Sequence, residues 1–151
     1  DLFSGAARKV GTGASYTIPA KYYGHQVYAI VTASGSELNS YVGGAFSEPD
    51  TVGSGTFAVQ PTPTISGRPR VGSRLTAHHG TWSPSSGVSY TYRWYEQIGS
   101  AAPSPIPGAT HATLTLTKAE LGDPISVEVT AHREHYTPAT ADSLATDAVV
   151  K

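Results

Sequence analysis

The sequence predicts an all-β fold, a β-sandwich, from two alternating runs of side chains. In the first run, large residues at every second position would share one face of a strand: Val88, Tyr90, Tyr92 and Trp94. In the second run, the residues at every second position are aliphatic: Ile125, Val127, Val129 and Ala131. A side-chain period of two indicates a half-buried strand. Two strands with one apolar face each need a second sheet to cover them, which is the arrangement of a β-sandwich.

The composition favours strands and turns over amphipathic helices. Charged residues make up only 14 % of the chain and the net charge is -1, so nothing attracts nucleic acid or an anionic membrane surface. No apolar stretch approaches the length of a membrane span, so we expect no membrane insertion. Because there is no Cys, the core must hold without a disulfide. Because there is no Met, we expect the chain to be a piece of a longer polypeptide.

An internal repeat predicts how the chain is organised. Residues 14–33 align without a gap on residues 112–131, 98 residues later, and both segments end in Val-Thr-Ala. This spacing is about the size of one immunoglobulin-type sandwich. Only thirteen residues precede the first copy, whereas three additional strand candidates precede the second. We therefore expect a partial immunoglobulin-like repeat at residues 1–57, holding the back-half strands, and a complete domain at residues 60–151. The Gly- and Pro-containing residues between 53 and 63 would link them.

Alternation and turn residues place the elements along the chain. In the first unit we expect strands at residues 16–18, 27–31 and 44–52. In the second unit we expect strands at residues 63–66, 74–78, 90–96, 113–116, 125–131 and 142–149. Three prolines make residues 101–108 an edge crossing. Residues 118–122 read as one helical turn that Leu-Gly ends.

These strands predict the core of the second unit and one strand pairing. The side chains expected to be buried together are Leu75, Trp94, Leu114, Leu116, Leu121, Ile125, Val127 and Val129. If the strands at 90–96 and 125–131 are antiparallel neighbours, outward Arg93 would lie near outward Glu128.

No residue pattern points to catalysis, to a cofactor or to a metal. There is no nucleophile elbow, no Gly-rich phosphate loop and no suggestively placed carboxylate pair, so we do not expect an enzyme. His132 and His135 flank Glu134 in a turn and could share a metal with it. A structural zinc site needs about four convergent ligands, and the adjacent His78 and His79 would point to opposite faces. Surface histidines are therefore the favoured interpretation.

Tyrosines of the first unit are candidate contacts for a partner or a glycan. Tyr22 and Tyr28 align with the polar residues Glu120 and Ser126, so both are expected to be exposed. Tyr23 aligns with Leu121 and is expected to lie in the core. Flat tyrosine rings suit stacking on sugars, although exposed tyrosines in half a domain would equally contact whatever completes that domain.

The second unit resembles the immunoglobulin-like repeats of actinobacterial surface and secreted proteins and of some phage structural proteins. The resemblance rests on residues 63–77 (PTISGRPRVGSRLTA), on Gly80-Thr-Trp-Ser-Pro84 and on Tyr92-Arg-Trp-Tyr95, and it continues to Tyr136-Thr-Pro-Ala139. It implies an extracellular or cell-surface location, or a virion, with Trp94 in the core and no catalytic residues. It also implies a structural or adhesion module of a larger assembly. The alternatives are a carbohydrate-binding appendage of a secreted hydrolase and a phage tail component.

The incomplete first unit implies a partner. Without the three missing strands, it would expose Ile18, Tyr23, Val27, Ala29 and Val31 on an uncovered face with open edges. A piece this small buries too little surface to stand alone. We therefore expect another polypeptide, from the same precursor or a neighbouring subunit, to cover residues 1–57. The alternative is that the second unit packs over this face.

Overall fold

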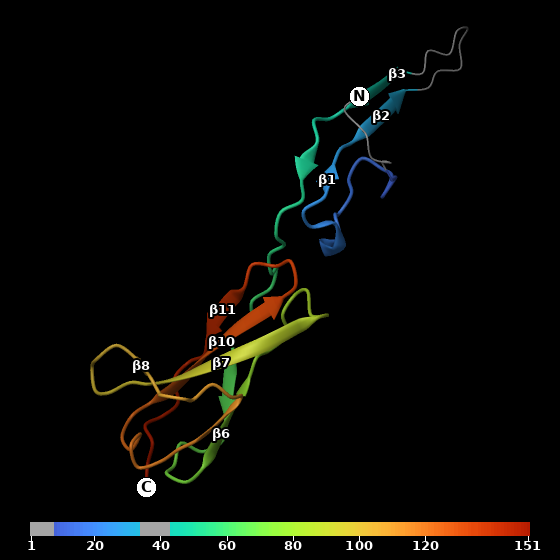
Figure 1. The fold of residues 1–151 in the computed structure, drawn as a ribbon. Helices are drawn as coiled ribbons and strands as arrows, with labels where there is room; N and C mark the ends of the chain where they lie inside the picture. The colour runs from blue at the N-terminus through green and yellow to red at the C-terminus, as the bar shows by residue number, and fades with distance from the viewer. Residues whose placement is uncertain (1–7, 34–42) are drawn as a thin grey trace. The chain divides into compact units, whose positions relative to one another are not determined.

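The structure is a computed structural model that describes residues 8–33 and 43–151. It is all-β, with several antiparallel sheets and one short 3₁₀ turn among the described residues (Figure 1). The chain divides into two compact units, unit 1 ending at Gly53 and unit 2 running from Ser54 to Lys151. In the described ranges, no helix is long and apolar enough to cross a membrane.

The larger sheet of unit 2 is built on the two strands that the alternation predicts. β7 (Val88–Glu96) and β10 (Ile125–Arg133) pair antiparallel along nine residues each, and they run side by side in Figure 1. β11 (Ala139–Asp142) pairs with the other edge of β10. β8 (Ser104–Pro105) pairs with the far edge of β7, where the edge crossing is expected. The sheet order is β11-β10-β7-β8.

A second, three-stranded sheet has the order β5-β6-β9. Its strands are β5 (Thr64–Ser66), β6 (Arg74–His78) and β9 (Thr113–Thr115), all antiparallel. Leu75 of β6 lies directly opposite Leu114 of β9, so both leucines project from the same face of this sheet.

The core of unit 2 combines side chains from both sheets. Trp94 is fully buried, and its Nε1–H donates a hydrogen bond to the carbonyl oxygen of His111 at 2.8 Å. One buried cluster contains Leu75, Ala77, Trp94, Leu114, Leu116, Ile125, Val127 and Val149. Val129 is also fully buried. The predicted core is therefore confirmed at seven of its eight positions, the exception being Leu121.

Leu121 is 41 % exposed, so its placement in the core is wrong. The neighbouring Glu120 is buried instead, because its carboxylate accepts hydrogen bonds from the backbone N–H and the hydroxyl of Thr117, at 2.7 and 2.9 Å. This pairing satisfies the buried carboxylate and turns the next side chain outward. The helical turn expected at residues 118–122 is absent, and the segment forms hydrogen-bonded turns.

The last strand and the unit boundary also differ from expectation. β11 begins before the expected strand at 142–149 and ends at Asp142, and the next large apolar residue, Leu144, is exposed. Phe57 is buried beside Trp82 and Tyr136, with ring centroids 5.4 and 5.5 Å away. Residues 54–57 therefore belong to unit 2, and the boundary expected at 57 is too late.

Unit 1 contains two small antiparallel pairs. β1 (Gln26–Val27) pairs with β4 (Asp50–Thr51), and β2 (Ile30–Ala33) pairs with β3 (Gly43–Phe46). A 3₁₀ turn, η1 (Ala20–Tyr22), precedes them. Residues 16–18, which we expected to form a strand, are irregular.

The strand pairing of unit 1 repeats that of unit 2. Val31 of β2 lies opposite Ala45 of β3, and their sequence counterparts Val129 of β10 and Ala141 of β11 lie opposite each other. The sequence offset between counterparts is 98 residues in the first strand and 96 in the second. The turn before β1 behaves in the same way, as two hydrogen bonds at 3.0 and 2.9 Å show: Gly24 N–H to Val52 O and Gly122 N–H to Val149 O.

A serine side chain holds the equivalent point of each pair. Ser47 donates its backbone N–H to the carbonyl oxygen of Ala29 (3.0 Å) and accepts the Ala29 N–H on its Oγ (2.9 Å). In unit 2, Ser143 makes the same two bonds to Val127, at 2.9 and 3.0 Å. At this point the two units therefore share the same backbone hydrogen bond. In both, a serine hydroxyl also accepts the N–H that would otherwise bond to a backbone carbonyl of the neighbouring strand.

The burial of Trp94 predicts a large effect on stability. Trp94→Ala would remove buried contacts from both sheets and leave a cavity, so the free energy of unfolding of unit 2 should fall by about 3–5 kcal/mol. Denaturant titration measures this loss. Ser89→Ala, on the exposed face of the same strand, should change the value by no more than about 0.5 kcal/mol. Equal effects of the two substitutions would contradict the register of β7.

The exchange of roles between Glu120 and Leu121 predicts an unusual order of effects. Glu120→Ala should cost about 1–3 kcal/mol, because two part-buried hydrogen bonds from Thr117 to a charged carboxylate are lost. Leu121→Ala should cost only about 0–1 kcal/mol, because Leu121 is 41 % exposed and lies outside the buried clusters. Denaturant titration of the two variants compares them directly. A greater loss of stability in the leucine variant would instead support burial of Leu121, as expected from the sequence.

Candidate functional site

The candidate site is the inner face of unit 1, to which Val27, Ala29 and Val31 belong. None of the side chains described in this unit is buried. Ile18 and Tyr23 are exposed, Val31 is 67 % exposed, and Ala29 is exposed beside half-buried Val27. The sequence expectation that an isolated remnant would show these residues to solvent is therefore confirmed for four of the five, with Val27 partly covered.

The contrast with unit 2 shows what this face lacks. The counterparts of Val27, Ala29 and Val31 are Ile125, Val127 and Val129, and all three of these are fully buried. The backbone pairing toward the last strand is the same in both units, so the difference lies in what covers the inner face. In unit 2 the other sheet contributes to that cover, because Leu75 of β6 and Leu114 of β9 belong to the same buried cluster as Ile125 and Val127.

The two units also differ in how many edges of the equivalent strands are paired. In unit 2, one edge of β10 pairs with β11 and the other with β7. In the described part of unit 1, β1 pairs only with β4, and β2 only with β3. The edge of Ile30–Ala33 opposite β3 therefore has no strand against it within residues 8–33 and 43–53. Such an edge is a template for an additional strand.

The outer face of unit 1 is apolar as well. Ile30 lies opposite Phe46, and the two side chains are 55 % and 65 % exposed. Their counterparts in unit 2 are the carboxylates Glu128 and Asp142, which also lie opposite each other. A cross-strand acidic pair on one unit is thus replaced by an apolar pair on the other. A strand pair that is apolar on both faces is typical of strands buried on both sides.

The candidate tyrosines of unit 1 are placed differently from expectation. Tyr23 is exposed, so its assignment to the core is wrong. Tyr22 and Tyr28 are half-buried, so the expectation of full exposure is also wrong. The Lys21 ammonium lies 5.0 Å from the centroid of the Tyr22 ring, and Tyr28 contacts Phe46 at 6.3 Å between centroids. Both rings therefore have close neighbours of their own.

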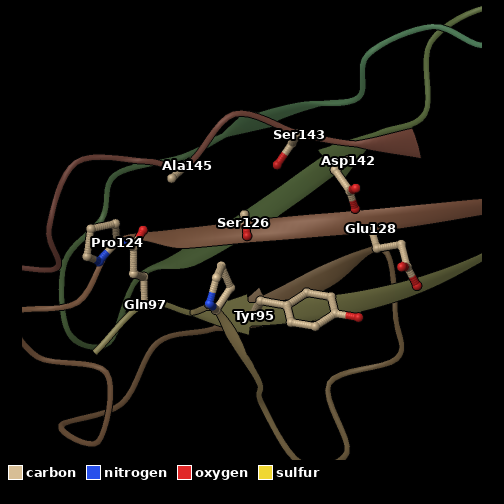
Figure 2. A pocket seen from close by; sticks show the side chains of 9 residues that line it. Tyr95, Gln97, Pro124, Ser126, Glu128, Asp142, Ser143 and Ala145 are labelled. Atoms are coloured by element: carbon tan, nitrogen blue, oxygen red, sulfur yellow. The ribbon is translucent and has the colours of Figure 1, made fainter. Parts of the chain in front are cut away.

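Unit 2 has a shallow pocket on the outer face of its larger sheet, with a volume of about 420 Å³ (Figure 2). Ser126 and Glu128 enter it from β10, Tyr95 from β7, and Asp142 and Ser143 from the end of β11. The Arg93 guanidinium lies 6.0 Å from the centroid of the Tyr95 ring, and the strand register places Arg93 opposite Glu128 as expected. The pocket is open to solvent and its lining mixes polar residues with apolar ones such as Pro124 and Ala145, so it does not enclose a small ligand.

The histidines of unit 2 hydrogen-bond in separate places. His78 Nε2 is 2.8 Å from Ser66 Oγ, and His132 Nε2 is 3.1 Å from Thr91 Oγ1. His79 stacks on Tyr90, with ring centroids 3.8 Å apart. His135 Nε2 lies 3.4 Å from the Glu134 carboxylate in an exposed turn. Across residues 8–33 and 43–151, no three His, Asp or Glu side chains are grouped so that they could hold a metal ion.

Two tyrosines on the inner face of β7 have perturbed ionisation. Burial raises the pKa of Tyr90 above its usual 10.0. Burial also raises the pKa of Tyr92, and repulsion from a Tyr90 phenolate adds to that rise. Both phenols lie in the packing of unit 2, where Tyr90 adjoins the Phe57–Trp82 cluster and Tyr92 adjoins the Trp94 cluster. These shifts follow from burial in the fold and indicate no acid or base chemistry.

Comparison with known proteins adds no assignment. The chain matches no family model, no curated protein and no solved structure.

The tyrosine shifts predict alkaline destabilisation. A phenol whose pKa is raised on folding contributes stability that is complete below 10.0 and is lost as the pH rises through the folded-state pKa. The denaturation midpoint of unit 2 should therefore fall as the pH is raised above 10.0. In the Tyr90→Phe/Tyr92→Phe double variant this fall should be smaller. An unchanged pH dependence in the double variant would show that other groups cause the loss.

Proposed function

We propose that the chain is a non-catalytic structural and adhesion module of a larger extracellular or surface assembly, a virion included. Unit 2 would be its complete immunoglobulin-like sandwich. Unit 1 would be a partial repeat that another polypeptide completes, from the same precursor or from a neighbouring subunit. One observation carries the proposal: unit 1 repeats the strand register of unit 2, yet the face that is core in unit 2 is exposed in unit 1.

The energetics support a partner for this face. Burial of apolar surface contributes about 25 cal/mol per Å², and it is the main term that offsets the loss of chain entropy. Unit 1 has the backbone hydrogen bonds of a sandwich half but no buried side chain among those described. Burying Ala29 and Val31 would supply this missing stabilisation, as the burial of Val127 and Val129 does in unit 2.

A glycan-binding function has weaker support. Sugar stacking needs an open, flat aromatic face, whereas Tyr22 is half-buried with Lys21 above its ring. Tyr28 and Phe46 are inclined to each other by 47°, so they form no flat platform. These rings fit a packed protein contact better than a pyranose.

Cysteine labelling tests the proposal cleanly, because the chain contains no native cysteine. In a dilute monomer of the whole chain, Val31→Cys should be alkylated at about the rate of an unfolded thiol. The matched variant Val129→Cys should react at least about a hundredfold more slowly, because that thiol is reached only when unit 2 opens. Within the native assembly, the thiol at position 31 should become slow as well.

Two results would count against the proposal. Slow labelling at position 31 in the dilute monomer would show that unit 2 covers the face and that the chain is one compact fold. Fast labelling at position 31 in both the monomer and the native assembly would show that nothing covers it.

A further inference from the structure

We propose that the partner, as part of completing unit 1, adds one antiparallel strand to the edge formed by Gln26–Val27 and Ile30–Ala33. The added strand would lie in the register that β7 holds against β10. This inference rests on the proposed function and names the chemistry of the segment that would bind. It would be an extended peptide with large apolar or aromatic residues at alternate positions on its inner face.

The register follows from unit 2. There, Trp94 lies opposite Val127 and Tyr92 lies opposite Val129. The counterparts of the two valines are Ala29 and Val31. The incoming strand would therefore place one large side chain opposite Ala29 and a second opposite Val31. Because alanine is smaller than valine, position 29 leaves more room than position 127 for an aromatic ring.

The outer face distinguishes the partner strand from β7 itself. In unit 2, Arg93 of β7 lies opposite Glu128, which lies opposite Asp142 of β11, so a cation meets a row of carboxylates. In unit 1 the same row consists of Ile30 and Phe46. A cation at the position of Arg93 would meet two apolar side chains and gain no ion pair. The partner strand is therefore apolar at this position.

A second copy of the chain is not the occupant that the structure favours. To donate β7, the second copy would have to break a pairing of nine residues and expose the fully buried Trp94. The open edge of unit 1 would gain only short strands in exchange. An extended segment of a different polypeptide carries no such cost, and strand addition to an open edge is a recurring mode of peptide recognition.

Two peptides added to the dilute whole chain test this proposal. The first has the sequence of residues 88–96, VSYTYRWYE, and the second has Val in place of Arg at the position of Arg93. Each peptide should protect backbone amides of Ile30–Ala33 from hydrogen exchange and slow the alkylation of Val31→Cys. The valine peptide should bind about 1.4- to 5-fold more tightly, which is the usual range for one cross-strand pair.

Two substitutions in the chain give matched controls. Val31→Lys places a charge on the inner face and should abolish protection of the neighbouring amides. Thr32→Lys, one residue along the same strand and on the opposite face, should retain it. Equal effects of the two substitutions would contradict binding through the inner face.

The outcomes separate this inference from the proposed function. If the thiol at position 31 is reactive in the monomer and neither peptide protects it, strand addition in the register of β7 is wrong, while completion of unit 1 by a partner of another kind stands. Protection that grows with chain concentration and needs no peptide would identify a second copy as the occupant and overturn the inference. Equal affinity for the two peptides would overturn the proposed register.

Discussion

The packing of one face of a strand pair against a second sheet is the interaction on which the rest of the structure depends. In unit 2, β7 and β10 are the longest strands, and their inner side chains are apolar at alternate positions. Trp94 is fixed at the centre by its hydrogen bond to His111 and by contacts with leucines of the other sheet, among them Leu75. The same pleat that buries Val127 turns Glu128 outward, where it lies opposite Arg93. The alternation along these strands therefore determines which side chains form the core, how the strands pair and which side chains face solvent. This arrangement is stable only while the inner face is covered.

Unit 1 shows the same strand pairing when the inner face is not buried, because none of its described side chains is buried. Its strands keep the register of unit 2, and Ser47 bridges the interrupted ladder as Ser143 does. Hydrogen bonds alone are a poor source of net stability, because the unfolded chain makes equivalent bonds to water. The exposed inner residue Val31 and the apolar outer pair of Ile30 and Phe46 are the surfaces that remain to be buried. In the proposed function, a neighbouring polypeptide would bury the inner face, and a strand added to the edge would supply backbone hydrogen bonds at the same time.

Much of the fold could be predicted from the sequence, because period-two patterns report directly on which side chains share a face. The core around Trp94 and the pairing of Arg93 with Glu128 follow from such patterns. Positions in turns could not be predicted in the same way. Glu120 is buried because Thr117 supplies two donors to its carboxylate, an interaction that no periodicity reveals, and Leu121 turns outward as a result. The failures at Tyr22 and Tyr23 have the same origin, because their counterparts Glu120 and Leu121 are themselves buried and exposed, the reverse of what their residue types suggest.

Amide hydrogen exchange, resolved by residue on the isolated chain at low concentration, tests the central claim most directly. The amides of β10 should exchange only through global opening of unit 2, since β10 is hydrogen-bonded on both edges in a covered sheet. The amides of β1 and β2 should exchange through local opening at a much smaller free energy, although their register matches that of unit 2. Protection in β2 equal to that in β10, in a chain shown to be monomeric, would contradict the account, because it would mean that unit 1 is complete without a partner.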